Sequence, residues 1–189
     1  MKIRLLLAFF LISANSFSQI PGIYLAKEFS KDQALYNAKK YIIKNLIGID
    51  KKLIKFDVDA LASASSGELT SLVYSCDEKN LSGLLLGFYG NYWNDAGVSY
   101  KAYSFKNLSE KNALEILSKL DKYIDDESKY LLADSDNHNM FFQYDDMTFL
   151  IYRRMGNVKI RVFWNGFDSE WESVSLKRTK KRFERKIKN

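Results

Sequence analysis

Three segments of the chain have apolar residues spaced three or four positions apart, the pattern of an amphipathic helix. They are residues 31–47, the stretch from Ser109 to Ile124, and residues 170–188. Each starts beside a serine whose hydroxyl can cap the free N–H groups of the first turn: Ser30, Ser109 and Ser169. Gln33 and Glu172 would complete capping boxes in the first and third helices, and Gly48 is expected to end the first.

Elsewhere the apolar residues alternate with polar ones or form short runs, and both patterns predict β-strands. The expected strands are residues 54–63, 69–76, 81–89, 98–105, 140–144, 147–153 and 158–164. In the first strand, Ala60 and Ala62 continue the inward-facing series that begins at Ile54. Residues 81–89 are apolar on both faces, which predicts a central strand rather than an edge strand.

The predicted order is helix, four strands, helix, three strands, helix. Short turns between consecutive strands favour antiparallel pairing. The expected fold class is therefore α+β: an antiparallel sheet, built as a meander of about four strands and then three more, with three helices largely on one face. The order also suggests a strand-strand-strand-helix unit that occurs twice, around residues 69–125 and 140–188, although the two segments share little side-chain identity.

The first eighteen residues have the composition of a secretory signal peptide. Lys2 and Arg4 precede an apolar run, residues 5–12, and a small-x-small site ends at Ser18. The run is too short to cross a bilayer, which takes about 20 residues. We expect residues 1–18 to be removed and residues 19–189 to form one exported domain, periplasmic or secreted and soluble. Its single cysteine, Cys76, excludes an intramolecular disulfide.

Positive charge is concentrated at the C-terminus. Residues 177–189 hold eight Lys or Arg against one acid, whereas residues 20–176 hold 19 basic and 22 acidic side chains. The last helix therefore has two interpretations: a helix docked on the sheet with a solvated basic back, or an interfacial helix drawn to anionic lipid or polyphosphate. We favour docking, and export makes nucleic acid a less favoured partner. The expected contacts with an anionic surface are Lys177, Arg178, Lys181, Arg182 and Arg185.

The segment GFYGNYWNDAG, residues 87–97, combines aromatic rings with turn-forming residues. Its position between two predicted strands indicates a hairpin turn at residues 90–97. A turn has no need of large rings, so these either fold back onto the rim of the core or stand out and stack against flat ligands such as sugars or partner side chains. The candidate ligand-binding residues are Tyr92, Trp93, Asn94 and Asp95.

The chain carries no motif of a known catalytic or metal site. Asp134, Asp136 and His138 resemble the opening of a calcium loop, but Asn139 replaces the glycine of its sharp turn, so we expect a solvated loop and no metal or other cofactor. His138 is the only histidine, which excludes zinc sites built on several histidines. Cys76 is expected to be a small buried hydrophobe.

These observations favour an exported, non-catalytic binding or interaction module of the cell envelope. Its partner would be an envelope protein, a small flat ligand or an anionic lipid surface. Two alternatives remain open: a hydrolase of unrecognised family that uses carboxylates, and a membrane-surface accessory protein that acts through the basic C-terminal helix.

Overall fold

A computed structural model of the chain describes residues 24–25, 31–134 and 137–188. The helices are α2 (Lys31–Tyr41), which continues as the π-helical η1 (Ile42–Ile47), the 3₁₀ turn η2 (Asp77–Lys79), α3 (Glu110–Asp126), α4 (Ser128–Ala133) and α5 (Ser173–Lys186). The strands are β1 (Tyr24–Leu25), β2 (Asp57–Ser63), β3 (Leu69–Cys76), β4 (Leu81–Trp93), β5 (Ser99–Ser109), β6 (Asn139–Tyr144), β7 (Met147–Arg154), β8 (Asn157–Trp164) and β9 (Phe167–Glu172). In this part of the chain no helix is long and apolar enough to cross a membrane.

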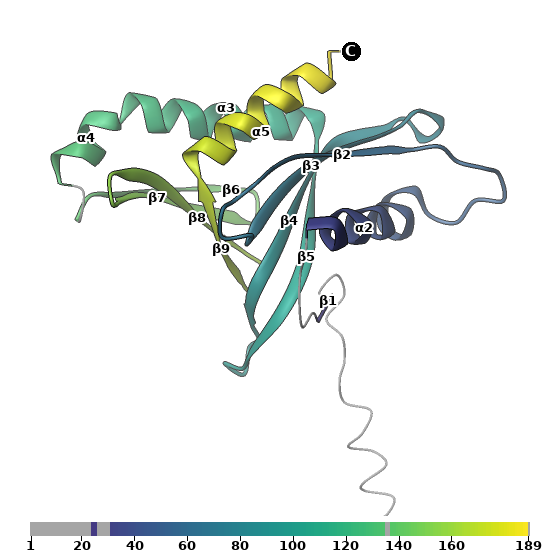
Figure 1. The fold of residues 1–189 in the computed structure, drawn as a ribbon, viewed down its shortest axis with the longest axis horizontal. Coiled ribbons are helices and arrows are strands. Elements are labelled where there is room, and N and C mark those ends of the chain that lie inside the picture. The colour runs from purple at the N-terminus through teal and green to yellow at the C-terminus, as the bar shows by residue number, and fades with distance from the viewer. Residues whose placement is uncertain (1–23, 26–30, 135–136, 189) are drawn as a thin grey trace, which may run out of the picture.

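The strands form one antiparallel sheet that forks along β4. One edge of β4 pairs with β5, while its other edge pairs first with β3, over residues 81–88, and then with β9 at Tyr92. The sheet therefore has two leaves, β2–β5 and β6–β9, which diverge from the long central strand (Figure 1). The α+β class and the central position of residues 81–89 are confirmed.

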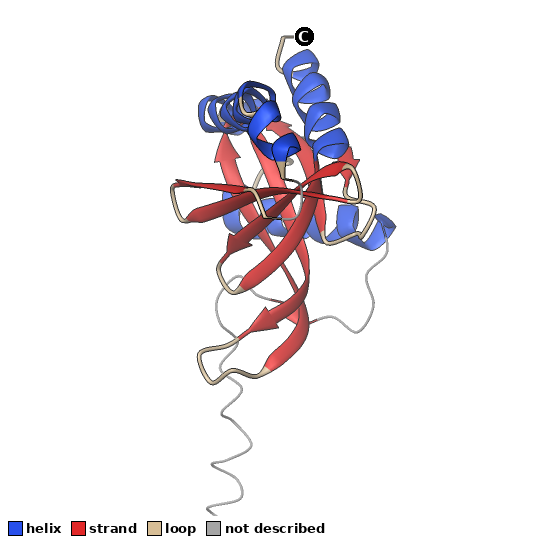
Figure 2. Cartoon of the chain, turned by 90° about the vertical axis from the view of Figure 1, so that its left-hand side faces the viewer, coloured by secondary structure: helices blue, strands red, loops and turns tan. Residues whose placement is uncertain are grey.

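Helices cover both faces of the sheet, whereas the sequence analysis placed the three predicted helices largely on one face. α3 and α5 lie together over one face, while α2 lies against the opposite face of the β2–β5 leaf (Figures 1 and 2). β4 serves both sides: Leu84 and Leu86 point into the larger core under α3 and α5, and Leu85 points into the smaller core under α2. This double burial explains why the strand is apolar at consecutive positions.

The predicted start of the last helix is wrong. Phe167, Ser169 and Trp171 are buried at alternate positions, so residues 167–172 form β9, and α5 begins only at Ser173. Ser169 is therefore a buried strand residue and not a helix cap. Each half of the chain consequently contains four antiparallel strands followed by a helix, rather than the three strands expected in the repeated unit.

The prediction for the first strand also needs correction. The pairing of β2 with β3 shifts register between Ala60 and Ala62, which is the signature of a β-bulge at Leu61. The bulge buries Leu61, of which 2% is exposed, and leaves Ala60 exposed. β2 also begins at Asp57, three residues later than expected.

Two predicted helix boundaries are confirmed. The Ser109 hydroxyl accepts the N–H of Asn112 at 3.3 Å and caps α3, and Gly48, with φ 77°, ends the first helix. Ser30 lies outside the described residues. The short helix α4 was not expected, and it occupies most of the segment between Ile124 and the predicted loop.

Candidate functional site

The predicted ligand-binding residues lie at the end of the β4–β5 hairpin, which extends away from α3 and α5 (Figures 1 and 2). β4 runs four residues further than expected and β5 begins at Ser99, so the turn itself comprises only residues 94–98. Tyr92 lies inside the molecule with 8% exposed, and its ring packs against Phe167 at 5.5 Å. Trp93 points the other way, with 55% exposed. Of the two candidate rings, one therefore belongs to the core and the other to the surface.

Asn94 organises the turn. Its Oδ1 accepts the N–H groups of Ala96 at 3.1 Å and Val98 at 2.8 Å, and its backbone bonds with Gly97 and Val98. Asp95 is exposed beside it. The side-chain carbonyl of Asn94 thus accepts hydrogen bonds within the turn, whereas Trp93 and Asp95 are exposed to solvent.

The apolar stripe of α5 is buried against the sheet, which confirms the docked interpretation of the basic helix. Leu176, Thr179 and Phe183 are fully buried, and Ile187 packs at the margin of the same core. The Thr179 hydroxyl also hydrogen-bonds the Ser71 hydroxyl of β3 at 2.6 Å.

Ion pairs neutralise part of the basic face of α5. Lys177 pairs with Asp125 at 3.2 Å, Lys180 with Asp121 at 2.6 Å, and Lys186 with the Asp59 carboxylate. By contrast, Arg178, Lys181 and Arg185 make no hydrogen bond or ion pair with other described residues, and Arg182 donates only to the Leu61 carbonyl. The unneutralised charge of α5 therefore lies on four of the five residues predicted to contact an anionic surface.

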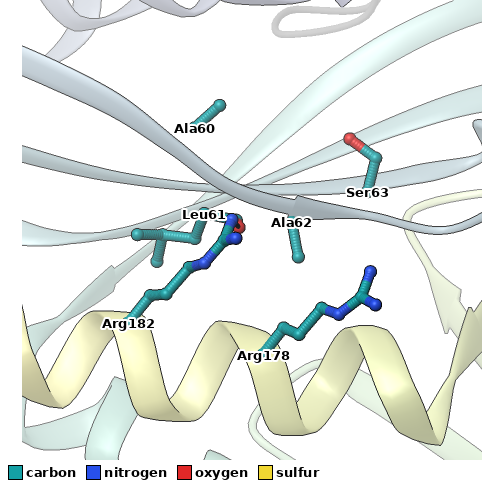
Figure 3. A pocket seen from close by; sticks show the side chains of 6 residues that line it. All are labelled: Ala60, Leu61, Ala62, Ser63, Arg178 and Arg182. Atoms are coloured by element: carbon teal, nitrogen blue, oxygen red, sulfur yellow. Dashed lines mark hydrogen bonds between the residues drawn. The ribbon is translucent and has the colours of Figure 1, made fainter.

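Two of these arginines line a shallow pocket between α5 and β2, called here the basic pocket (Figure 3). Its volume is about 290 Å³, and it is lined by Ala60, Leu61, Ala62, Ser63, Arg178 and Arg182. Arg178 and Arg182 lie one helical turn apart and reach from α5 toward the strand. The described residues that line it contribute two guanidinium groups and no carboxylate.

The bulge in β2 forms one wall of the basic pocket. By turning the Leu61 side chain into the core, it leaves the Leu61 carbonyl where Arg182 can reach it. β2 is an edge strand, so this hydrogen bond also satisfies one carbonyl of an otherwise open edge. The sequence predicted the two arginines but not this wall, because the alternation through Ala60 and Ala62 gave no signal of a bulge.

The paired acids Asp145 and Asp146 form hydrogen bonds that stabilise the fold. Asp145 and Asp146, in the β6–β7 turn, both accept from Lys106, at 2.7 and 2.6 Å, and Asp146 also accepts from the Trp164 indole at 2.9 Å. Burial works to raise the pKa of Asp146, but the hydrogen bonds from Lys106 and Trp164 outweigh it and leave that pKa lowered. The pair forms the end of a hairpin, as its sequence position indicates.

His138 contacts the preceding helix, α4. Its Nδ1 donates to the Tyr130 carbonyl at 2.6 Å, and its ring stacks on Tyr130 at 4.2 Å. Asp134 accepts from Asn137, and Asp136 lies outside the described residues. The described residues contain no group of three or more His, Cys, Asp or Glu side chains that could hold a metal ion. Cys76 is buried in β3.

No family model, no curated protein and no solved structure matches this chain. Function therefore has to be inferred from the geometry and charge of the surfaces described above.

Proposed function

We propose that this protein is an exported, non-catalytic binding module that holds an anionic group in the basic pocket. The observation that supports this most directly is the pair of guanidinium groups, Arg178 and Arg182, beside a hollow that no carboxylate lines. Guanidinium groups bind phosphate and carboxylate oxygens through paired hydrogen bonds. Among the described residues, Arg178 has no hydrogen-bond acceptor, and Arg182 donates to the Leu61 carbonyl and keeps its other donors.

The energetics of α5 favour a bound anion. Two like charges four residues apart on a helix repel each other by about 0.2–0.5 kcal/mol. Elsewhere on α5, Lys177, Lys180 and Lys186 pair with Asp125, Asp121 and Asp59, whereas Lys181 and Arg185 have no acid partner among the described residues. At the basic pocket no described acid has this role, so an external anion would supply the missing countercharge.

The alternative, a hydrolase that uses carboxylates, has less support. One hollow of about 320 Å³ is lined by three carboxylates, Asp57, Asp59 and Glu110, but it also contains Lys186, whose ammonium group binds Asp59. A role at a membrane surface would rest on the charges of α5 alone, since its apolar stripe is buried.

A titration of the purified mature protein tests the pocket. We expect saturable binding of inorganic phosphate or of vesicles containing phosphatidylglycerol, weakened at least tenfold in the R178Q/R182Q double variant. K181Q/R185Q is the matched control, because it also removes two exposed cations four residues apart on the same helix, both outside the pocket. The single variant R178Q keeps the Arg182–Leu61 hydrogen bond. Weaker binding in R178Q therefore cannot be caused by a folding defect that follows from the loss of that bond.

Three outcomes would overturn the proposal for the pocket: no binding of either probe, equal losses in K181Q/R185Q and R178Q/R182Q, or unchanged binding in R178Q/R182Q. Equal losses would mean that the basic face acts as diffuse charge, with binding that fades as salt rises.

Export rests on the leader, residues 1–18. Mass spectrometry of the protein recovered outside the cytoplasm should give a mature chain that begins at Gln19. Recovery only of a chain that keeps residues 1–18 would contradict this part of the proposal.

A further inference from the structure

A second hollow lies beside Trp93, where the sheet forks, and is called here the fork hollow. It has a volume of about 180 Å³. Its walls come from the turn between β2 and β3, from the β4 and β5 strands of the hairpin, and from β8 and β9 of the other leaf. It occupies the stretch of β4 between the end of its pairing with β3, at Phe88, and its contact with β9, at Tyr92.

The rim of the fork hollow carries an exposed aromatic ring. Successive residues of a strand point to opposite faces, so the burial of Tyr92 in the core leaves Trp93 facing outward at the hollow. The indole makes no ring contact with other described residues. Its flat face is therefore available for stacking.

The hollow is also lined by a fixed set of polar groups. Arg161 Nε donates to Asp168 at 2.7 Å, and Arg161 also lies 3.6 Å from the Glu68 carboxylate. Glu68 is held in turn by the Glu170 N–H at 2.7 Å. The hydrogen bond to Asp168 raises the pKa of Arg161, so this side chain keeps its charge. These groups are oriented before any ligand arrives, which lowers the entropic cost of binding.

Three further residues leave the hollow open and polar. Asn91 and Lys101 line it and make no side-chain hydrogen bond with other described residues. Gly90 has φ 146°, a conformation that side chains rarely adopt, and a Cβ there would meet only Glu68 Cγ, at 4.0 Å. Gly90 therefore permits this backbone conformation within β4 and places no side chain in the hollow that it lines.

We infer that the fork hollow is a carbohydrate-binding site in which one sugar ring stacks on Trp93 and its hydroxyls bond to Arg161, Asp168 and Asn91. A sugar ring has an apolar C–H face that suits an indole, and hydroxyls that both donate and accept. The hollow matches this chemistry because it offers carboxylate acceptors, guanidinium and ammonium donors, and an amide that does both. The acids Glu68 and Asp168 balance Arg161 and Lys101, which favours a neutral ligand over an anion.

The size of the hollow limits the ligand to one ring at a time. Its volume lies below the roughly 300 Å³ at which pockets for drug-sized molecules begin. Such a site would hold one residue of a longer glycan, with the rest of the chain in solvent. This inference is independent of the anion proposed for the basic pocket.

Tryptophan fluorescence provides the test. Of the three tryptophans, Trp164 and Trp171 are buried, so Trp93 is the one that a ligand can reach. The probes are tetrasaccharides of glucose, mannose and N-acetylglucosamine, each titrated to 10 mM. We expect at least one to change the emission saturably and to protect the indole from acrylamide quenching.

Variants of Trp93 show whether binding depends on stacking against the indole. Binding of each variant and of the unaltered protein is measured by calorimetry. W93A should weaken binding at least tenfold and W93F less, because a smaller ring keeps part of the stacking surface. V98A is the matched control, since Val98 is exposed in the same turn but does not line the hollow. The inference is overturned if none of the three probes binds, or if W93A binds the responding probe as tightly as the unaltered protein.

Discussion

At the scale of single residues, Tyr92 and Trp93 show how position along a strand decides the role of a side chain. The sequence marks both as large rings near a turn, with nothing to separate them. The separation comes from the pairing of Tyr92 with Phe167 of β9, a strand that the sequence analysis did not predict. The candidate site consequently shifts from the tip of the hairpin to the fork hollow, which includes Trp93 but neither Tyr92 nor Asn94.

Gly166 offers a residue-scale prediction about this same contact. Gly156 and Gly166 have nearly equal positive φ angles, 78° and 80°, but a Cβ on Gly166 would lie 2.5 Å from Tyr92 Cε2, whereas nothing lies within 4 Å at Gly156. Gly156→Ala should destabilise the fold by about 1 kcal/mol through backbone strain. Gly166→Ala should cost about 1–3 kcal/mol more because of overpacking. Urea unfolding measures both, and equal losses would contradict the close Tyr92 contact.

Glu172 offers a prediction about pH. Its carboxylate accepts from the Ser65 N–H at 3.0 Å and lies 3.4 Å from Lys159 Nζ. Burial works to raise the pKa of Glu172, but the hydrogen bonds from Ser65 and the charge of Lys159 outweigh it, so the folded pKa lies below its usual 4.5. A lowered pKa contributes stability above pH 4.5 that disappears as the pH falls through the folded value.

Glu172→Gln should therefore lower the free energy of unfolding at pH 7 by about 1 kcal/mol and reduce the loss of stability between pH 7 and pH 3. Asp95→Asn, which changes an exposed acid of the β4–β5 turn, is the control and should leave the pH profile as it is. Parallel profiles for Glu172→Gln and the unaltered protein would show that Glu172 does not contribute.

At the scale of secondary-structure elements, the sequence predicts what local spacing and caps determine. The apolar periodicity located α2, α3, β3 and β4, and Ser109 marked the start of α3. The boundary of α5 failed because Ser169 and Glu172 match a capping box by type, while the alternation of Phe167, Ser169 and Trp171 indicates a strand. The pair Asn165–Gly166, both at positive φ, is a two-residue hairpin signal that could have identified β9.

The basic pocket could be predicted only in part, for a physical reason. Arg178 and Arg182 are recognisable from helical spacing alone, because residues four apart lie on one side of a helix. The wall that Leu61 provides depends on a register shift against β3, and the fork hollow depends on contacts between leaves some 100 residues apart in sequence. Such long-range contacts follow from the packing of the whole sheet and leave no local pattern.

Phe183 tests the docking of α5 as an element. Its side chain is fully buried in the larger core, so Phe183→Ala should lower the free energy of unfolding by about 3 kcal/mol, the usual cost of emptying a packed aromatic site. Lys181→Ala, on the exposed side of the same helix, should change it by less than about 0.5 kcal/mol. Denaturant midpoints compare the three proteins. An unchanged midpoint for Phe183→Ala, together with lost binding to anionic vesicles, would restore the interfacial interpretation of the helix.

At the scale of the whole molecule, the two leaves of the sheet share a single large core. The cluster beneath α3 and α5 combines Leu84 and Leu86 of the first leaf with Phe149, Ile160 and Trp171 of the second. α5, which follows the second leaf in sequence, packs against β2 and β3 of the first, and two of its lysines, Lys177 and Lys180, pair with acids of α3. The basic pocket forms because α5, from the second half of the chain, packs against β2, from the first half.

The shared core predicts that the two halves unfold together, and the chain contains a reporter for each. Cys76 is the only cysteine and is buried in β3, so its reaction with a thiol reagent reports opening of the first leaf. Trp164 and Trp171 lie in the second leaf, and their fluorescence reports its unfolding once Trp93 is replaced by phenylalanine. Pulse labelling of Cys76 and tryptophan fluorescence should give the same urea midpoint, as expected for a cooperative domain.

A Cys76 that becomes reactive at lower urea than the fluorescence transition would mean that the β2–β5 leaf opens while the β6–β9 leaf remains folded. The basic pocket, built from β2 and α5, would then be lost before the second leaf unfolds, and binding of its anion should raise the Cys76 midpoint selectively.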